Sequence, residues 1–278
     1  MKKKLVLIMM LSVMVITTAF ALGACNQEFK GFDIEVAKAV GEKLGLAIDF
    51  KEIDWGTKEI ELEAKNIDLI WNGLTIDDER KAQMCISTPY LYNKQVAVIR
   101  KQDAAKFTDK ASLATANGMT YEDGSAGEKI AAQEFPNVNS KPSASQMLAF
   151  TAVKAGTYDV VIVDSVLAGF YTGTDTNFQD LMIVEGVVLS EEQYGVAARK
   201  EDIGTMDKIN TALSELYADG TLAKIAAKYG LENELCDCTY VSRWDSLSDA
   251  EKAGWNYLTQ KGNIVVGYTL YAPIAFFE

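Results

Sequence analysis

Few kinds of catalytic chemistry are open to this chain, because its 278 residues include no histidine. That absence excludes a Ser-His-Asp or Cys-His catalytic unit, excludes metal sites built on imidazole, and removes the usual general base near neutral pH. Its 39 acidic and 27 basic residues give a net charge of −12, whereas nucleic-acid binding needs a basic surface. The composition therefore favours a binding protein over an enzyme and predicts neither a cofactor, a metal site nor a nucleic-acid partner.

One cysteine, Cys25, follows the pattern of an export signal. Met1–Lys4 is positively charged, residues 5–22 are almost wholly apolar, and two small residues precede the cysteine. The Leu-Gly-Ala-Cys ending resembles a bacterial lipobox, in which the cysteine is diacylated. A transmembrane helix is the alternative, since the apolar stretch is of marginal length for a bilayer. We expect residues 1–24 to be a lipoprotein signal peptide, leaving a protein lipid-anchored to the outer face of the cell membrane, or periplasmic.

The three remaining cysteines are Cys85, Cys236 and Cys238, and an odd number cannot all pair within one chain. Export permits a disulfide, although a bridge between Cys236 and Cys238 would be tight. Unpaired thiols are equally compatible with the sequence, so the disulfide state stays open.

The elements that must position any site alternate between helices and strands. A helix opening at Asp33 has apolar residues on one face and is stopped by Gly45. Strands are predicted over residues 48–53, 68–71 and 95–99, the second of them short and apolar. Such alternation is typical of α/β units around a largely parallel sheet.

The same pattern recurs later in the chain. A predicted helix over residues 143–155 leads into a buried strand over residues 158–164. This strand ends on Asp164, as the earlier apolar strand ends on Asn72. Ligands in open α/β sheets bind at the carboxyl ends of strands. The sequence therefore predicts two α/β lobes that each present polar side chains at such an edge.

Several motifs in consistent order resemble the bacterial extracellular solute-binding proteins of family 3, the substrate-binding lipoproteins of polar amino-acid ABC transporters. They are Gly31–Ala37, Leu74–Lys81, Ser87–Tyr90, Asp123–Gly127 and Tyr194–Lys200. The resemblance implies a two-lobed, periplasmic-binding-protein-like (type II) α/β fold, in which each lobe is a mainly parallel sheet flanked by helices. Lobe 1 would comprise residues 25–98 and 195–278, and lobe 2 residues 99–194.

One departure from the family is large. A segment like Lys261–Pro273 begins the mature proteins of the family, directly before the Gly-Phe-Asp helix, whereas here it lies near the C-terminus. Joining Glu278 to Glu28 would restore the usual order. The sequence therefore resembles a circular permutant, cut in an exposed turn, with the first strand of lobe 1 supplied by the C-terminus and residues 232–246 linking the old ends. The alternative is that this order is an artefact of how the gene or the chain was defined.

The resemblance also implies a function. The protein would be the substrate-binding component of an ABC importer, a monomer that captures a free amino acid between two closing lobes and delivers it to the permease. Closure would occur about the strands near residues 95–101 and 194–199. No covalent chemistry would be involved.

A ligand carboxylate is best held by an arginine fork together with backbone N–H groups. Arg80 lies where the family has its carboxylate-binding arginine, and Thr75 and the Gly73 backbone would add donors. The alternative for Arg80 is a surface ion pair with Asp77 or Glu79.

A ligand ammonium needs carboxylate and carbonyl acceptors. Asp164 matches the ammonium-binding aspartate of the family, and its alternative is to cap the helix that starts at Ser165. Ser125 lies in a Gly-Ser-Ala-Gly turn before a helix, which suits anion-binding N–H groups, although a capping serine is the alternative.

The aliphatic part of a ligand suits aromatic walls. Tyr271 and Trp55 match the stacking positions of the family, and Trp71 and Asn72 lie beside them, although Trp71 is equally compatible with the core. Thr269 lies near the position of an acid that helps the family hold cationic ligands. Its presence slightly favours a polar uncharged amino acid.

Two other classes of function remain open. Cyclohexadienyl-dehydratase-like lyases are exported enzymes that resemble these receptors and need an acid over a prephenate-like ring. Glu79, Asp164 and Glu185 are candidates, but no spacing supports one of them. A ligand sensor for a signalling partner is the other class. The sequence identifies neither the amino acid nor the permease.

Overall fold

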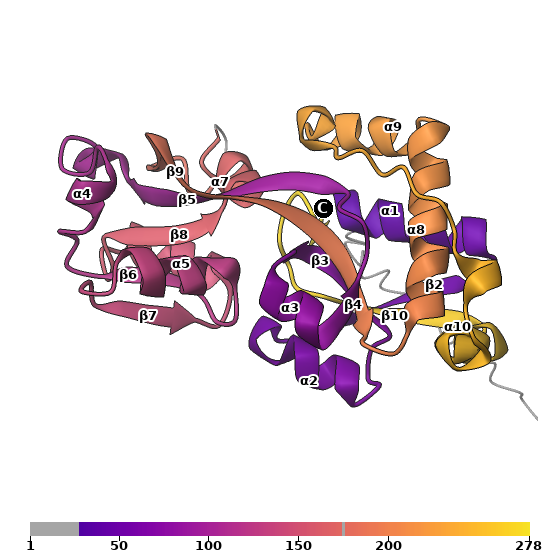
Figure 1. The fold of residues 1–278 in the computed structure, drawn as a ribbon. Helices are drawn as coiled ribbons and strands as arrows, with labels where there is room; N and C mark the ends of the chain where they lie inside the picture. The colour runs from indigo at the N-terminus through magenta and orange to yellow at the C-terminus, as the bar shows by residue number, and fades with distance from the viewer. Residues whose placement is uncertain (1–27, 174–175) are drawn as a thin grey trace, which may run out of the picture.

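Two long strands, β5 (Leu91–Arg100) and β9 (Leu181–Arg199), pair antiparallel and run from one lobe of the molecule into the other (Figure 1). The computed structural model describes residues 28–173 and 176–278, so the predicted signal peptide and Cys25 lie outside the described residues. No helix within the described ranges is long and apolar enough to cross a bilayer. The predicted lobe boundaries, after residues 98 and 194, fall inside β5 and β9.

All strands of the described residues except β1 and β11 form one sheet, which continues through both lobes. Its inner strands run parallel, β10 beside β2 and β3 in lobe 1, and β6 beside β7 and β8 in lobe 2. The spatial order is β2 (Ala47–Glu52), β10 (Asn263–Tyr268), β3 (Leu69–Thr75), β9, β5, β8 (Val160–Asp164), β6 (Met119–Glu122), β7 (Ser140–Ser143), with β4 (Met84–Ile86) on β9.

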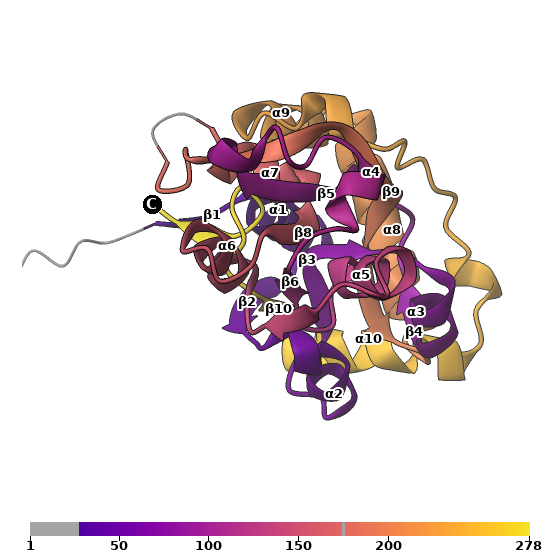
Figure 2. The ribbon, with the colours of Figure 1, turned by 90° about the vertical axis from the view of Figure 1, so that its left-hand side faces the viewer.

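Helices flank the sheet in both lobes (Figures 1 and 2). Lobe 1 carries α1 (Phe32–Leu44), α2 (Lys58–Glu63), α3 (Asp78–Gln83), α8 (Ile203–Ala218), α9 (Thr221–Lys228) and α10 (Asp249–Lys261). Lobe 2 carries α4 (Lys110–Leu113), α5 (Ala126–Glu134), α6 (Gln146–Lys154) and α7 (Ser165–Tyr171). Short 3-10 turns cover Trp55–Thr57, Lys101–Asp103, Glu232–Glu234 and Trp244–Ser246. The predicted α/β fold class is confirmed.

Local sequence signals set the ends of several elements. Helix α1 ends at Gly45, whose left-handed φ of 68° lets its N–H bond the last carbonyls of the helix. Ser248 and Glu251 form a capping box at the start of α10. Strand β3 continues to Thr75, beyond the predicted residue 71, because Leu74 and Thr75 pair with β9.

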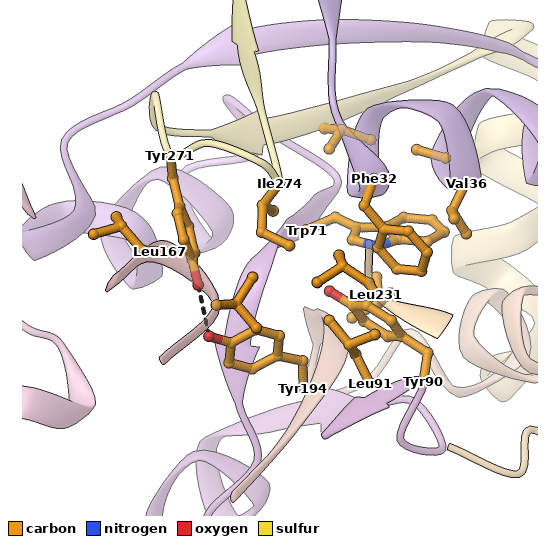
Figure 3. Packing of buried hydrophobic residues seen from close by; sticks show 14 of the residues in the cluster. Phe32, Val36, Trp71, Tyr90, Leu91, Leu167, Tyr194, Leu231, Tyr271 and Ile274 are labelled. Atoms are coloured by element: carbon orange, nitrogen blue, oxygen red, sulfur yellow. Dashed lines mark hydrogen bonds between the residues drawn. The ribbon is translucent and has the colours of Figure 1, made fainter. Parts of the chain in front are cut away.

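The largest apolar cluster runs through both lobes. It joins side chains of α1 and α8 in lobe 1 to side chains of α6 and α7 in lobe 2. Figure 3 draws part of it, with Phe32, Trp71 and Tyr90 packed together near Val36. A second cluster lies within lobe 2. Both lobes therefore share one apolar core, and a polar site must lie at the edge of that core.

The two ends of the described chain meet. Glu28 and Glu278 exchange backbone hydrogen bonds of 2.9 and 3.1 Å. Strands β1 (Phe29–Lys30) and β11 (Phe276–Phe277) pair antiparallel beside them, and Figure 2 shows the C-terminus next to β1. Strand β10, near the C-terminus, lies in the interior of the sheet between β2 and β3.

Candidate functional site

A cavity lies between the two lobes. The lobe 1 wall consists of Trp55, Asn72, Gly73, Thr75, Arg80, Thr269 and Tyr271. The lobe 2 wall consists of Glu122, Ser125, Ala126, Gln146 and Asp164. Every ligand-binding residue predicted from the sequence lines this cavity, except Trp71.

Arg80 lies in α3, directly after the loop that follows β3. It is only 5% exposed, so it is not the surface residue of the alternative interpretation, although its Nε lies 3.9 Å from Asp77. Its Nη1 donates to the Thr75 carbonyl at 2.8 Å, and its Nη2 donates to the Gly124 carbonyl across the cleft at 3.2 Å. The guanidinium is thus a buried cation with a fixed orientation at the cavity.

Gly73 lines the cavity, but its N–H, which we expected to help hold a ligand carboxylate, already has a partner within the protein. That N–H donates to Asp33 Oδ2 at 2.8 Å, and the Tyr90 hydroxyl donates to the same oxygen. Burial raises the pKa of Asp33 to about 7, against the opposing effect of those two hydrogen bonds. The carboxyl thus uses the donor that we had expected a ligand to use.

Asp164 ends β8 and faces the cavity from lobe 2. Its side chain makes no capping hydrogen bond to α7, so the capping alternative is not what the structure has. Its Oδ1 accepts from Asn93, Gln95 and the Tyr194 hydroxyl at 2.7–2.8 Å. Its Oδ2 accepts from Gln146 at 3.0 Å. Burial nevertheless raises the pKa of Asp164, because four neutral donors only partly replace water.

Two further carboxyl groups surround Asp164, and the sequence interpretation missed both. Glu122 ends β6 on the lobe 2 wall, and Glu192 lies behind it on β9, sharing the donors Asn93 and Gln95 with Asp164. Burial, and then the neighbouring Asp164, raise the pKa values of Glu122 and Glu192 to about 8. Glu122 had a readable signal, because it ends an apolar strand in lobe 2 as Asp164 does.

Aromatic side chains close two sides of the cavity. Trp55 and Tyr271 lie on the lobe 1 wall, where we predicted them. The Tyr271 hydroxyl hydrogen-bonds that of Tyr194 at 2.7 Å, which links it to Asp164 (Figure 3). Trp71 instead points into the core and packs against Tyr90. The reason is strand periodicity, because Trp71 and Asn72 are consecutive on β3 and face opposite sides.

Asn72, Thr269 and Ser125 complete the polar lining. Asn72 Oδ1 accepts two hydrogen bonds from Thr269, through its N–H and its hydroxyl, both at 2.8 Å. Asn72 Nδ2 has no partner although it is buried. Ser125 caps α5, since its Oγ accepts from the Glu128 N–H at 3.3 Å, and it also lines the cavity. The capping alternative for Ser125 therefore holds together with its place at the site.

The two lobes touch around the cavity. The Gly124 carbonyl accepts from Lys58 at 3.0 Å as well as from Arg80, and both donors belong to lobe 1. Lys129, on α5, reaches Asp77 at 2.8 Å and Glu79 at 2.7 Å across the cleft. The lobes are therefore closed over the site in this structure.

The arrangement can hold a molecule with opposite charges at its two ends. The lobe 1 wall offers one cation and no carboxylate, and the lobe 2 wall offers two carboxyl groups and no cation. Within residues 28–173 and 176–278, no group of three or more His, Cys, Asp or Glu side chains has an arrangement that could hold a metal ion.

Comparisons with known proteins agree with this geometry. L-cystine-binding protein TcyJ of Escherichia coli (strain K12) is 26% identical over 215 residues, which are 76% of this chain and 77% of that protein. An ancestral arginine-binding protein solved with arginine is 34% identical, with a TM-score of 0.65 over 71% of this chain and 87% of that one.

A second solved structure is that of the ancestral amino acid-binding protein AncCDT-1, a precursor of cyclohexadienyl dehydratase. It is 27% identical, with a TM-score of 0.66 over 71% of this chain and 84% of that one. The sequence model of bacterial extracellular solute-binding proteins, family 3, matches residues 13–232. The chain therefore belongs to the bacterial extracellular solute-binding proteins of family 3.

Proposed function

We propose that this protein is the substrate-binding component of an ABC importer and captures a free amino acid between its two lobes. The observation that carries the proposal is the pairing of Arg80 and Asp164, from different lobes, on opposite walls of one closed cavity. A free amino acid bears one carboxylate and one ammonium, so each wall matches one end of the ligand. The family and the amino acid-binding relatives support the same conclusion.

In this proposal the ligand carboxylate binds Arg80 and Thr75 on the lobe 1 wall, with N–H groups at the start of α5 near Ser125. The ammonium binds Asp164, whose oxygens are already oriented by four hydrogen bonds. Trp55 and Tyr271 flank the aliphatic part. Contact with both lobes stabilises the closed form, which then docks on the permease.

A screen of thermal stability across the free amino acids tests the function. We expect at least one to raise Tm, because a ligand that binds only the folded state stabilises it. Arg80→Ala and Asp164→Ala should each abolish that shift, and the exposed Arg243→Ala is the matched control that should keep it. Wild-type shifts in both cavity variants, or no shift with any amino acid, would contradict the proposal.

We also propose that the protein has no catalytic activity. No prephenate turnover is expected from the purified protein, and turnover at an enzymatic rate would favour the lyase alternative.

Export with a lipid anchor at Cys25 remains part of the proposal, as does action as a monomer. The intact mass of the mature protein tests the anchor, because two acyl chains and loss of residues 1–24 change it in a defined way.

Circular permutation is proposed on structural grounds as well. The paired ends at Glu28 and Glu278, and the interior position of β10, are what a cut in a hairpin turn would leave. The segment 232–246 is bound along lobe 1, with the Cys236 N–H on the Tyr90 carbonyl at 3.1 Å. A chain joined from 278 to 28 through Asn-Gly, with new ends opened within 232–246, should fold and bind ligand unchanged. Failure of that chain to fold would contradict the permutation.

A further inference from the structure

We propose that Glu122 determines the specificity of the cavity and selects an amino acid whose side chain carries a positive charge. The inference rests on the proposed function and deepens it, because it names the class of ligand. Glu122 is 3% exposed and ends β6 on the lobe 2 wall. It lies apart from the Arg80 end of the cavity, and it shares Gln146 with the network around Asp164.

The first step is a balance of charge within the cavity. A bound zwitterion pairs its carboxylate with Arg80 and its ammonium with Asp164. The second carboxyl group of the lobe 2 wall, Glu122, is then left without a cationic partner, because Gln146, which hydrogen-bonds it, is neutral. Lys58 is the protein cation that acts on Glu122. Its Nζ, however, is already bound to the carbonyls of Trp55 and Gly124, at 3.1 and 3.0 Å, and to Glu59, at 3.2 Å. A ligand cation would therefore supply the counter-charge that the protein does not.

The second step is an independent observation on the same wall. Gln146 is 6% exposed, and its Nε2 is committed to Asp164 Oδ2 at 3.0 Å. Its Oε1 is buried and has no hydrogen-bond partner. An orphaned acceptor beside a carboxyl group suits a ligand group with several N–H donors, as ammonium and guanidinium groups are. A buried polar atom of this kind is costly until a ligand satisfies it.

The inference changes the expectation drawn from the sequence. Thr269 stands where the family has an acid for cationic ligands, and this slightly favoured a polar uncharged amino acid. The structure brings a different carboxyl group to the cavity, from lobe 2 rather than lobe 1. Burial raises the pKa of Glu122 to about 8, so it stays protonated until a cation enters, and a neutral ligand leaves it so.

Isothermal titration calorimetry with arginine, lysine and glutamine tests the inference on the full mature chain. We expect arginine or lysine to bind more tightly than glutamine. Glu122→Gln should weaken binding of the basic ligand by about 10- to 100-fold, the effect of losing a hydrogen bond to a charged group, and should leave glutamine binding within a few-fold. Glu191→Gln, an exposed neighbour on β9, is the matched control and should change neither affinity.

The outcomes separate this inference from the proposed function. If glutamine or another neutral amino acid binds wild type and the basic ligands do not, the specificity inference is wrong and the proposed function stands. If Glu122→Gln folds with an unchanged preference for the basic ligand, the inference is also wrong. If no amino acid binds wild type, the proposed function itself fails.

Discussion

The two walls of the cavity differ in the sign of their charge and in how they are held. On the lobe 1 wall, Arg80 is oriented by backbone carbonyls, one from each lobe. On the lobe 2 wall, Asp164 is oriented by neutral side chains, and burial followed by the neighbouring Asp164 raises the pKa values of Glu122 and Glu192. One wall is a single cation in a rigid frame, and the other is a cluster of buried acids that hold their protons more tightly than usual.

This difference explains why recognition should be coupled to closure. Each wall alone matches only one end of an amino acid, so neither lobe can bind the ligand fully. On the cavity walls, buried carboxyl groups gather only in lobe 2, and a cation from the ligand would favour their ionised forms. We therefore expect the buried acids of lobe 2 to oppose closure of the unliganded protein. The contacts that lobe 1 makes across the cleft should favour closure.

The largest expected effect concerns the acidic wall and pH. Folded Glu122 and Glu192, with pKa values of about 8, keep protons that the unfolded chain releases above its ordinary carboxyl pKa. Unfolding therefore releases protons, and the stability of the unliganded protein should fall as pH rises from about 5 to about 8, by about 1 kcal/mol per pH unit for each group.

Tm measured against pH isolates the Glu122 part of this slope. The groups that act on Glu122 are Asp164 on β8, Lys58 on α2 and Gln146 on α6. Glu122→Gln, neutral at every pH, should flatten the curve, and Glu191→Gln should leave it unchanged. Asp33, whose pKa is also raised, contributes equally to all three proteins. Parallel curves for wild type and Glu122→Gln would show that folding does not raise the pKa of Glu122.

A smaller effect is expected where the walls touch. Gly124 has a φ of 67°, and a Cβ there would lie 3.1 Å from Lys58 Nζ and 3.2 Å from Gly56 Cα in lobe 1. Gly186 has a φ of 73° with open space around it, so it is a matched control for backbone strain alone. Both Gly→Ala changes should lower the free energy of unfolding by about 1–2 kcal/mol. Only Gly124→Ala should also weaken ligand binding, and equal affinities in calorimetry would mean that this contact does not limit closure.

The smallest effect concerns the ion pairs that Lys129 makes across the cleft. Lys129→Ala removes the ion pairs to Asp77 and Glu79 across the cleft, and half-exposed pairs of this kind contribute about 0.2–1 kcal/mol. We expect affinity to fall less than about fivefold at low salt and the difference to vanish at high salt. Lys110→Ala, which breaks an ion pair to Glu134 inside lobe 2, should leave affinity unchanged. A salt-independent loss with Lys129→Ala would point to packing instead of charge.

Much of the fold was readable because local signals act over short distances. Gly45 ends α1, as predicted, and a capping box of Ser248 and Glu251 starts α10. The motif around Arg80 led to a residue that lines the cavity, since the loop after β3 delivers it there. Trp71 was ambiguous because a residue next to a site in sequence can lie on either face of its strand.

The sequence by itself determined the α/β pattern, the lack of histidine chemistry and the two opposite charges, Arg80 and Asp164, that the walls present. Only the tertiary structure decided that Glu122 and Glu192 gather around Asp164, that Asp33 takes the Gly73 N–H, and that Glu28 pairs with Glu278. These contacts join residues far apart in the chain, and burial sets their strength. Neither spacing nor composition carries that information, because desolvation depends on what the completed fold packs around each group.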